Sequence, residues 1–543
     1  MFDLTPYAGR WVALVGEHVA GVGYTPEEAV LLARRNRPKE RLAVRFVEPP
    51  GGEPLSLPPL MDELRPFLQT HEDPVYLVGG AVRDAVLGRS GKDLDFVVPR
   101  QAIKLAFKVG DALGLPAYPL DKERDTGRVV LPEGGVTLDF ARFRGADLNE
   151  DLRDRDFTIN TLALPATAET TASIIDICGG LADLQARQIR LTHDDALRND
   201  PVRTLRAVRQ ALSLGFSLPP ETATAVTTAA PLLVNTSRER IRDELVKLLE
   251  TAVPHEALRY LHELGLLPVT LPDVAALADV AQSPPHHEAV LAHTMSVLRW
   301  LVVVETAVLT PAAPASPALQ LAQEAFAPYR AELNAHVDRV VDGGGNGRLL
   351  LRLGALFHDV GKQETQTVGE DGRYRFFGHD KVGAKRAKVQ LRRLAFSNQA
   401  QEHVAAIVRG HMRPLLLVEA QGAAPSRRAV YRFFRDIKSA GLDVGLLALA
   451  DHLATYEGPG PAEKWANLVA MVAGLYRFYF ERYEETVAPV PLVNGRDLIQ
   501  ALDLVPGPEI GRLLRLIEEA QASGQLTTRE EALTFAQERV SGI

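Results

Sequence analysis

Apolar and polar positions alternate in short runs at the start of the chain and predict a small mixed module. "WVALV" and "HVAGVG" predict two short strands, and "LAVRFV" predicts a third. Between them, "TPEEAVLLARR" predicts a helix capped by its threonine. "EPPGGEPLSLPP" then breaks the periodicity with proline and glycine, which predicts a linker. We therefore expect residues 1–50 to form a small α+β module, whose role the sequence does not indicate.

Further along, the period of the hydrophobic pattern changes from mixed to helical. Strand and helix signals alternate over residues 60–185, which predicts a mixed α/β head. After residue 185 the pattern is helical almost throughout, so we expect a neck over 186–275, a larger helical domain over 280–480 and a tail over 481–543. The predicted fold class is a multidomain α+β protein whose second half is largely all-α.

Composition places the chain among ordinary globular proteins. It has 543 residues, of which 46% are hydrophobic and 24% charged. We find neither a signal peptide nor an apolar run near the roughly 18 residues that a membrane span needs, so we expect no membrane partner. Cys178 is the only cysteine, which excludes an intrachain disulfide and a cysteine-rich metal site. A reducing cytoplasm is the expected location.

Charge adds a local feature to this picture. The formal net charge is -8, so the surface is not basic all over. Residues 185–209, however, contain six arginines against three aspartates. Such a local stripe is what contact with phosphates requires, whatever the sum over the chain.

The stretch "YLVGGAVRDAVLGRSGKDLDFVVP", residues 76–99, carries the first candidate chemistry. A strand that ends in Gly79 and Gly80, followed by a helix, predicts a phosphate cradle, because bare backbone N–H groups can approach an anion there. Strand alternation sends Asp93 and Asp95 to the same face, where two carboxylates could hold Mg²⁺ against a triphosphate. Each motif alone is weak, with a tight turn or a solvated strand as the alternative; the combination is far more specific.

In this order and spacing, the stretch resembles the signature of the DNA polymerase beta-like nucleotidyltransferases, in particular the class II tRNA nucleotidyltransferases and bacterial poly(A) polymerases. "DLRDRDFTINTLAL", "GGLADLQARQIRLT" and "NDPVRTLRAVRQA" continue the resemblance in family order. Asp154 stands where the family usually has arginine, and Thr161 where it usually has alanine. The resemblance implies nucleotide contacts by Gly79, Gly80, Arg83 and Arg155.

The third of these motifs predicts how a base is chosen. Asp200, Arg203, Arg206 and Arg209 recur every three positions, so we expect them along one side of a helix. Asp200 can accept a hydrogen bond from an exocyclic amine while Arg203 donates to the neighbouring ring acceptor, which selects C and A over U and G without a template. The resemblance implies that the later arginines bind the triphosphate. The alternative is a surface helix with solvated arginines.

Two further features of the head stay open at this point. Asp139, in "VTLDFARFR", is a candidate third carboxylate on a neighbouring strand, or it faces solvent or pairs with an arginine. Between Arg144 and Arg155 lie only the ten residues "GADLNEDLRD". Family members that add a whole CCA end have a longer flexible loop here, so the resemblance favours CC addition, with full CCA addition as the alternative.

The second half holds a second candidate metal site. His293, the pair His358 and Asp359, and Asp451 lie on predicted helices, and this ordered set resembles the HD phosphohydrolase superfamily, in which such residues hold a divalent metal that activates water. His379 and His411 fit the longer version of the pattern, as contacts to a phosphate or a second metal. The metal's identity is not indicated. In some family members the fused HD domain is a phosphatase or a 2′,3′-cyclic phosphodiesterase.

Together these patterns predict a template-independent, magnesium-dependent tRNA nucleotidyltransferase. It would add cytidines, CC or CCA, from CTP and ATP to the 3′ acceptor end and release pyrophosphate. A CC-adding enzyme would depend on a separate A-adding enzyme. The alternatives are a poly(A) polymerase of the same family, an HD hydrolase with an RNA-binding head, and a non-catalytic tRNA-binding protein.

Overall fold

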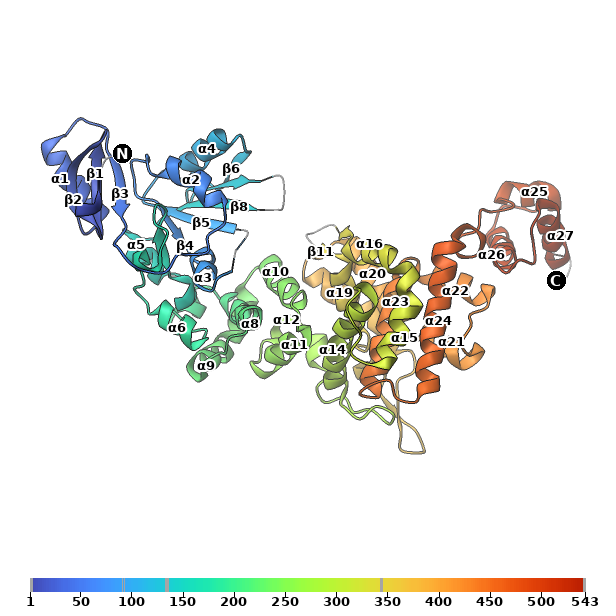
Figure 1. Cartoon of the computed structure of the whole chain (residues 1–543). Helices are drawn as coiled ribbons and strands as arrows, with labels where there is room; N and C mark the ends of the chain where they lie inside the picture. Colours follow the sequence, from blue (N-terminus) through green and yellow to red (C-terminus); the bar gives the residue numbers. More distant parts are fainter. Residues whose placement is uncertain (1–2, 90, 92, 132–135, 342–344, 541–543) are drawn as a thin grey trace. The chain divides into compact units, whose positions relative to one another are not determined.

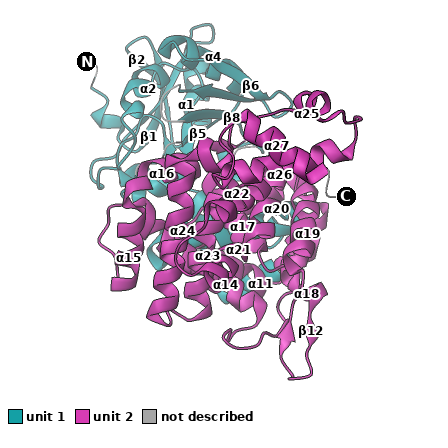
Figure 2. Cartoon of the chain, turned by 90° about the vertical axis from the view of Figure 1, so that its right-hand side faces the viewer, with its two compact units in different colours: residues 1–229 teal, residues 230–543 magenta. Residues whose placement is uncertain are grey.

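The computed structural model describes residues 3–89, 91, 93–131, 136–341 and 345–540. The chain divides into two compact units, residues 1–229 and 230–543, coloured teal and magenta in Figure 2. This division falls inside the segment 186–275 that the sequence predicts as a neck. The finer domain boundaries stay predictions.

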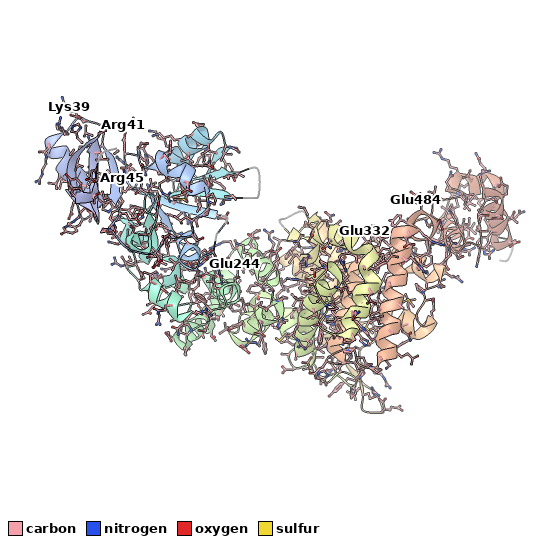
Figure 3. All side chains as sticks on the ribbon, in the orientation of Figure 1. Lys39, Arg41, Arg45, Glu244, Glu332 and Glu484 are labelled. Atoms are coloured by element: carbon pink, nitrogen blue, oxygen red, sulfur yellow. The ribbon has the colours of Figure 1, made fainter. Side chains whose placement is uncertain are left out.

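The N-terminal module has the predicted elements. Its three antiparallel strands lie in the order β2-β1-β3, with bounds β1 (Arg10–Val15), β2 (His18–Gly23) and β3 (Ala43–Val47). Helix α1 (Pro26–Asn36) packs on β1 and β2, and the side chain of Thr25 caps it by accepting a hydrogen bond from the backbone N–H of Glu28 at 3.2 Å. The basic residues labelled in Figure 3, Lys39, Arg41 and Arg45, lie in β3 and the segment before it.

This module shares one hydrophobic core with the head. Trp11, Ala13 and Val44 belong to the same buried cluster as Tyr76 and Leu152 of the head. The rings of Trp11 and Tyr76 meet edge-on, with centroids 5.4 Å apart. Burying these side chains together excludes water from both, so the core of the module is continuous with that of the head.

The head is built on a six-stranded sheet in the order β6-β7-β8-β5-β4-β9. Figure 1 labels β4, β5, β6 and β8 of this sheet. Its strands are β4 (Tyr76–Val78), β5 (Asp93–Val98), β6 (Ala117–Asp121), β7 (Thr126–Val130), β8 (Thr137–Arg142) and β9 (Ala163–Pro165). Strands β5 and β8 are parallel, and all other pairs are antiparallel. Helix α4 (Ala102–Leu113) packs its apolar face on β6, β7 and β8. The mixed sheet places residues from distant parts of the sequence at one end of β5.

Short helices complete the first unit. They are α2 (Leu60–Leu68), α3 (Gly80–Val86), α5 (Leu148–Arg153), α6 (Gly180–Ala186), α7 (Ala196–Asn199), α8 (Arg203–Leu214) and α9 (Pro220–Ala229). Helix α8 has a strongly one-sided pattern: Leu205, Ala207, Val208 and Ala211 are buried, which fixes the direction of its arginines.

The described part of the second unit is helical, as predicted, except for two short antiparallel strand pairs, β10–β11 (Val340–Val341, Gly345–Asn346) and β12–β13 (Thr367–Val368, Tyr374–Arg375). Its first helices are α10 (Arg238–Leu249), α11 (Pro254–Glu263), α12 (Leu267–Thr270) and α13 (Pro272–Ala275). The central bundle contains α14 (Val290–Leu309), α15 (Pro317–Phe326), α16 (Arg330–Asp338), α17 (Gly347–Phe357), α18 (Lys362–Thr365), α19 (His379–Arg393), α20 (Asn398–Gly410), α21 (Arg413–Gln421), α22 (Arg427–Ile437), α23 (Ala440–Thr455) and α24 (Ala462–Glu481).

Among the described residues, helix α14 is the one candidate membrane span. It has 20 residues and is apolar enough to cross a membrane by length and composition. In the fold it packs against α11, α17 and α23, and 56% of its apolar window is buried inside the protein. The apolar residues of α14 therefore belong to the core of the helical unit.

The chain ends in a helical tail with a small core of its own, formed by α25 (Gly495–Leu502), α26 (Pro508–Ala522) and α27 (Arg529–Val540). Leu498 and Leu513 are fully buried there. On its other side, Glu519 of α26 pairs with Arg432 of α22, with 2.6 Å between Oε1 and Nη2. This ion pair and the packing of α22 on α26 join the tail to the bundle.

Candidate functional sites

The predicted phosphate cradle lies where β4 turns into α3. Gly79 has φ +72°, a conformation that glycine adopts readily, and its N–H donates to the main-chain oxygen of Leu162 at 3.2 Å. A Cβ atom at Gly79 would lie 3.2 Å from Nη1 of Arg155 and 4.0 Å from Oδ2 of Asp95. The glycine thus brings its backbone within contact distance of an arginine and of the predicted catalytic carboxylate.

The two aspartates of β5 lie on the same face of the strand, as predicted. Leu94 and Phe96 are buried on the other face, which leaves Asp93 and Asp95 exposed. Thr137 on β8 donates its hydroxyl to Oδ1 of Asp93 at 2.9 Å. Asp95 lies beside Asp139 in the parallel register of the two strands.

Asp139 is on the neighbouring strand, as predicted, but it pairs with an arginine. Arg128 donates to it through two nitrogens, at 2.7 Å from Nε and 2.6 Å from Nη2. A bidentate pair of this kind is among the stronger ion pairs and uses both carboxylate oxygens. This contact favours the alternative for Asp139 over a role as a third metal ligand.

The electrostatic environment of Asp95 favours the binding of a cation. Part of Asp95 is exposed to solvent, but protein surrounds most of its carboxylate. This loss of hydration raises the pKa of Asp95 to about 6, and the negative charges of Asp139 and Asp93 raise it further toward that value. Carboxylate oxygens are the ligands that Mg²⁺ prefers, and a bound cation would offset the mutual repulsion of these groups. Asp93 and Asp95 are therefore the residues that would hold Mg²⁺.

Two predicted nucleotide-binding arginines lie beside this face, each held by a carboxylate. Arg83 donates to Asp84 at 2.8 Å and, through Nη1, to Oδ1 of Asn160 at 2.8 Å. Arg155 donates to the fully buried Asp151, with 2.9 Å between Nη2 and Oδ2. Both guanidinium groups are thus fixed in direction before any ligand binds.

The base-selecting motif differs from the prediction in one respect. Asp200 does not lie on the same helix as the arginines: it follows the end of α7, and α8 begins at Arg203. Pro201, which has no backbone N–H to donate, lies between them and favours this break. Asp200 and Arg203 still lie together, with 3.9 Å between Oδ2 and Nε.

Arg203 is buried and holds main-chain oxygens. Its Nη2 donates to the carbonyl of Asp154 at 2.8 Å, and its Nη1 to the carbonyls of Arg155 and Ala196 at 3.3 Å each. Burial lowers the pKa of this guanidinium, although nearby carboxylates counteract the effect. Its Nε is buried without a hydrogen-bond partner among the described residues, so one donor remains beside Asp200.

Behind these residues lies a buried polar network that the sequence analysis missed. Asp156 accepts hydrogen bonds from Asn160 at 2.8 Å and from Arg206 at 3.1 Å, and Asn160 also donates to Gln210 at 3.2 Å. Burial alone would raise the pKa of Asp156, but Arg206 and Asn160 outweigh it and lower the pKa. The four-residue spacing of Asp156 and Asn160 is the one sequence feature that could have indicated this network. Arg209 follows one turn after Arg206 on α8.

The ten residues between Arg144 and Arg155 form an ordered turn and helix α5. Asp147 caps α5 by accepting from the N–H of Glu150 at 2.9 Å, and Glu150 accepts from the N–H of Ala146 at 2.8 Å. At the base of the segment, the N–H of Arg144 donates to Asp151 at 3.0 Å. The short segment is therefore held at its start, along its length and, through Arg203, at its end.

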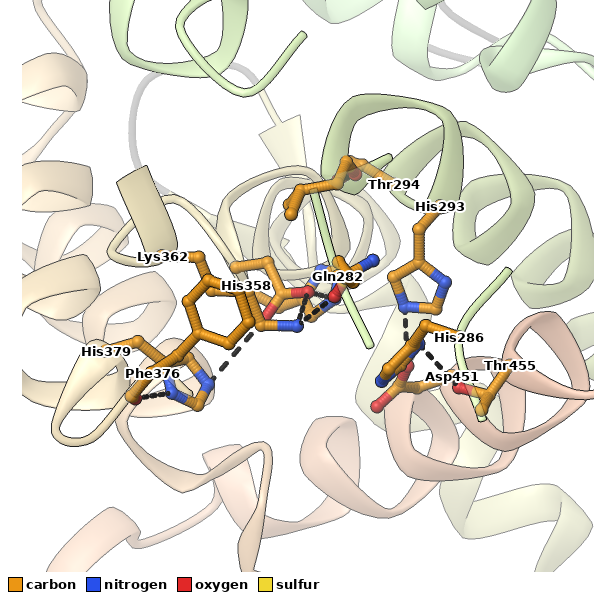
Figure 4. Close-up of polar contacts among 12 residues, drawn as sticks. Gln282, His286, His293, Thr294, His358, Lys362, Phe376, His379, Asp451 and Thr455 are labelled. Atoms are coloured by element: carbon orange, nitrogen blue, oxygen red, sulfur yellow. Dashed lines mark hydrogen bonds and ion pairs between the residues drawn. The ribbon is translucent and has the colours of Figure 1, made fainter. Parts of the chain in front are cut away.

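A second constellation lies in the helical unit, and it brings the predicted HD residues together. His293 on α14 contacts Asp451 on α23, with 2.9 Å between Nε2 and Oδ1 (Figure 4). His358 and Asp359 follow α17 at once, and the ligand atoms of His293, His358 and Asp359 lie within 4.8 Å of one another. The four residues are buried, so a metal bound here would be shielded from bulk water.

His379 and His411 lie on the other side of Asp359. Their Nε2 atoms are 3.1 Å apart, and they lie 3.6 and 3.8 Å from Oδ1 of Asp359. Burial and the neighbouring His358 and His379 lower the pKa of His411 to about 4, so its imidazole is neutral at pH 7. A neutral imidazole has the lone pair that metal binding requires.

Two residues near this centre were not predicted. Lys362 contacts Oδ2 of Asp359 at 2.7 Å and Oε1 of Gln282 at 2.6 Å. The ring of His286 lies 4.8 Å from that of His293, centroid to centroid. Lys362 could have been found from the sequence, because it follows Asp359 by three residues in the same motif. His286 comes from a loop without a local pattern.

The comparisons with known proteins cover both constellations. Family models match a "Poly A polymerase head domain" over residues 75–190, a "Probable RNA and SrmB- binding site of polymerase A" over 215–277, an "HD domain" over 332–456 and tRNA nucleotidyltransferase domain 2 over 488–536. Nucleotidyltransferase and HD domains are typically metal-dependent. Asp93, Asp95 and Asp139 lie within the first match. The HD match contains His358, Asp359, His379, His411 and Asp451, while His293 lies before it.

Curated relatives extend the similarity to most of the chain. An A-adding tRNA nucleotidyltransferase of Deinococcus radiodurans is 35% identical over 482 residues, which are 87% of this chain and 97% of that protein. A CC-adding tRNA nucleotidyltransferase of Thermus thermophilus is 35% identical over 466 residues, 84% of this chain and 92% of that protein.

Among solved structures, a CCA-adding enzyme in complex with ATP has the same fold, with a TM-score of 0.56 at 20% identity over 89% of this chain and 95% of that one. Along this chain, the family models match in the order of head, RNA-binding region and HD domain. The chain therefore belongs to the class II tRNA nucleotidyltransferases, with a poly(A) polymerase-type head and a fused HD domain.

Proposed function

We propose that this tRNA nucleotidyltransferase adds two cytidines to the 3′ end of tRNA and stops there. The observation that carries the proposal is the short segment between Arg144 and Arg155. Because its hydrogen bonds hold it at both ends, the base-selecting residues beside it have little freedom to rearrange from one nucleotide to the next. A pocket that keeps its first preference would accept CTP twice and would not change to ATP.

In this proposal each residue of the head has a separate task. Asp93 and Asp95 hold Mg²⁺, which would neutralise charge on the triphosphate and favour attack by the terminal ribose hydroxyl. Gly79, Gly80, Arg83 and Arg155 bind the phosphates, together with Arg206 and Arg209. Asp200 and the remaining donor of Arg203 contact the base edge, and both C and A offer an amine beside a ring acceptor.

The competing specificity is A addition. The Deinococcus radiodurans and Thermus thermophilus relatives are both 35% identical to this chain, and one adds A while the other adds CC. Overall identity therefore does not distinguish the two, and the local geometry of the segment 145–154 favours CC addition.

The decisive experiment uses three tRNA substrates that end before the first C, after one C or after both. Purified protein with Mg²⁺ receives CTP, ATP or both, and products are resolved at single-nucleotide length. With CTP, we expect the first substrate to grow by two residues, the second by one and the third not at all. Adding ATP to CTP should not change these lengths, and ATP alone should extend none of the substrates. Growth of the third substrate with ATP, without growth of the first with CTP, would instead identify an A-adding enzyme.

We also propose a second activity, phosphate-ester hydrolysis at the HD centre. Asp359 lies between two candidate ligand sets, one with His293 and His358 and one with His379 and His411. Two metals that share a carboxylate can activate water and stabilise a leaving oxygen. Lys362 provides a positive charge for a phosphate beside them. A 2′,3′-cyclic phosphate at an RNA end is the substrate class that the family resemblance implies.

To test this, wild type and Asp359→Asn are incubated with a 2′,3′-cyclic nucleotide and with p-nitrophenyl phosphate, in Mg²⁺, Mn²⁺, Ni²⁺ or Co²⁺. We expect metal-dependent hydrolysis that the variant loses by at least a hundredfold. Hydrolysis at equal rates in both proteins would exclude the HD centre as its source.

A further inference from the structure

A third cluster of histidines and a carboxylate lies in the helical unit, outside the HD centre. It consists of His336 on α16, His403 on α20 and Asp443 on α23. Its three ligand atoms lie within 4.8 Å of one another. None of the residues belongs to the HD pattern in the sequence, and the chemistry proposed above does not use them.

The three side chains converge on a single oxygen. Nε2 of His336 and Nε2 of His403 each lie 2.8 Å from Oδ2 of Asp443. Asp443 is fully buried, and 8% and 13% of the two histidine side chains are exposed. Oδ1, the second oxygen of Asp443, is buried without a hydrogen-bond partner among the described residues. A simple hydrogen-bonded group would share its two donors between the two oxygens, because an unsatisfied buried acceptor costs about 1–3 kcal/mol.

The contacts of His403 add a second inconsistency with simple hydrogen bonding. Nη2 of Arg339 lies 3.0 Å from Nε2 of His403. Since a guanidinium can only donate, Nε2 must offer its lone pair to Arg339, yet the same atom must carry a proton to bond Oδ2 of Asp443. No single tautomer of His403 satisfies both contacts.

We propose that His336, His403 and Asp443 bind a divalent transition-metal ion such as Zn²⁺ at a structural site. A cation would use the lone pairs of both Nε2 atoms and a carboxylate oxygen, so neither histidine would need a proton directed at Oδ2 of Asp443. Arg339 would then have to turn away from Nε2 of His403, because a metal-bound nitrogen has no lone pair left to accept its hydrogen bond. Tetrahedral ligand atoms around zinc lie about 3.3 Å apart, so the 2.8 Å contacts need to open by about 0.5 Å. The ion would tie α16, α20 and α23 together.

The position of Asp443 on α23 gives this site a structural consequence. Asp451 of the HD centre follows eight residues later on the same helix, a rise of about 12 Å. An ion at Asp443 would therefore fix the helix that carries Asp451. The site stands independently of the proposed functions, because it shares no residue with the head or with the HD centre.

The first test counts zinc per chain by mass spectrometry, after dialysis against Zn²⁺ and desalting. We expect wild type to keep one more zinc than Asp443→Asn. In an Asp359→Asn background, which disables the HD centre, one zinc should remain and then be lost in the Asp359→Asn/Asp443→Asn double variant. Equal zinc content with and without Asp443 would overturn the proposal. Circular dichroism checks folding, and His403→Gln provides a second variant of the same site.

A substitution of Arg339 distinguishes a metal site from a hydrogen-bond network that binds no metal. Its positive charge opposes a cation beside His403, so Arg339→Gln in the Asp359→Asn background should bind Zn²⁺ at least tenfold more tightly in titration calorimetry. The control is Arg330→Gln at the start of α16, the helix that Arg339 follows. Nε of Arg330 donates to the main-chain oxygen of Val308 and not to the cluster. Unchanged or weaker binding in Arg339→Gln would contradict the metal site.

Discussion

At the scale of single residues, the head concentrates like charges on one face of β5. Asp93, Asp95 and Asp139 lie close together, and Arg128 pairs with one of them. Without a cation, the charge on Asp95 opposes folding, because the folded state raises the pKa of this carboxyl to about 6 and so favours its protonated form. The arrangement that we propose for catalysis is thus costly to the metal-free protein.

Asp95→Asn should therefore abolish nucleotide transfer and stabilise the metal-free protein. A group whose pKa is raised on folding loses its favourable contribution as pH rises through the folded value, here about 6. At pH 8 we expect the variant to be more stable by about 1 kcal/mol, less than the pKa shift alone implies because the carboxylate is partly solvated. Thermal unfolding in EDTA at pH 8 and pH 4 measures this, and the difference should vanish at pH 4. A destabilised variant at pH 8 would contradict the prediction.

The individual site residues were predictable to different degrees. Asp93 and Asp95 follow from alternation within one strand, so the sequence suffices to place them. The pairing of Asp139 with Arg128 depends on which strands become neighbours, which no local pattern encodes. Similarly, the spacing of Asp200 and Arg203 predicts one helix, but the helix begins only at Arg203.

At the scale of elements, one carboxylate reinforces the attachment of the N-terminal module to the head, in addition to the hydrophobic core that they share. Oε1 of Glu48, just after β3, accepts hydrogen bonds from Thr170 at 2.7 Å through both its N–H and its hydroxyl, and from Ser173 at 3.0 Å. Burial alone would raise the pKa of Glu48, but these bonds outweigh it and lower the pKa. The sequence predicted each element of this module, but its attachment depends on side chains more than 100 residues apart.

Glu48→Gln should weaken this attachment. A carboxyl with a lowered pKa contributes stability above its unfolded value, near 4.5, and loses it as pH falls through the lower folded value. We expect a loss of about 1 kcal/mol at pH 7 that shrinks progressively below pH 4.5. Urea unfolding at several pH values checks this, with the exposed Glu53→Gln as the control. If the loss of stability in Glu48→Gln stayed the same at every pH down to the most acidic one tested, its cause would be altered geometry and not the charge of Glu48.

At the scale of the whole molecule, the two candidate centres lie in different units of the chain. The proposed nucleotide-binding residues all precede residue 229, and the HD residues all follow residue 230. The sequence predicted the fold class and this order of domains, because long periodic segments and ordered motifs survive without tertiary information. It did not predict the third cluster, because His336, His403 and Asp443 lack a recognisable spacing.

This separation predicts that the two activities can be removed independently. Asp93→Asn should lose nucleotide transfer by at least a hundredfold and keep hydrolysis within about twofold, while Asp359→Asn should do the opposite. Both activities are measured on one preparation of each variant. Joint loss in either variant, with circular dichroism unchanged, would show that the centres are coupled.

The three carbonyl contacts of Arg203 have a consequence for how such enzymes diverge. The arginine that we propose to contact the base also holds the end of the segment 145–154, so a deletion or insertion near Asp154 should directly disturb nucleotide choice. Extra residues between Ala146 and Asp147 would spare that anchor. Natural insertions that change nucleotide specificity should accordingly accumulate at the N-terminal end of the segment 145–154. The same position is where a longer loop should be inserted to test whether the enzyme can then add a third nucleotide.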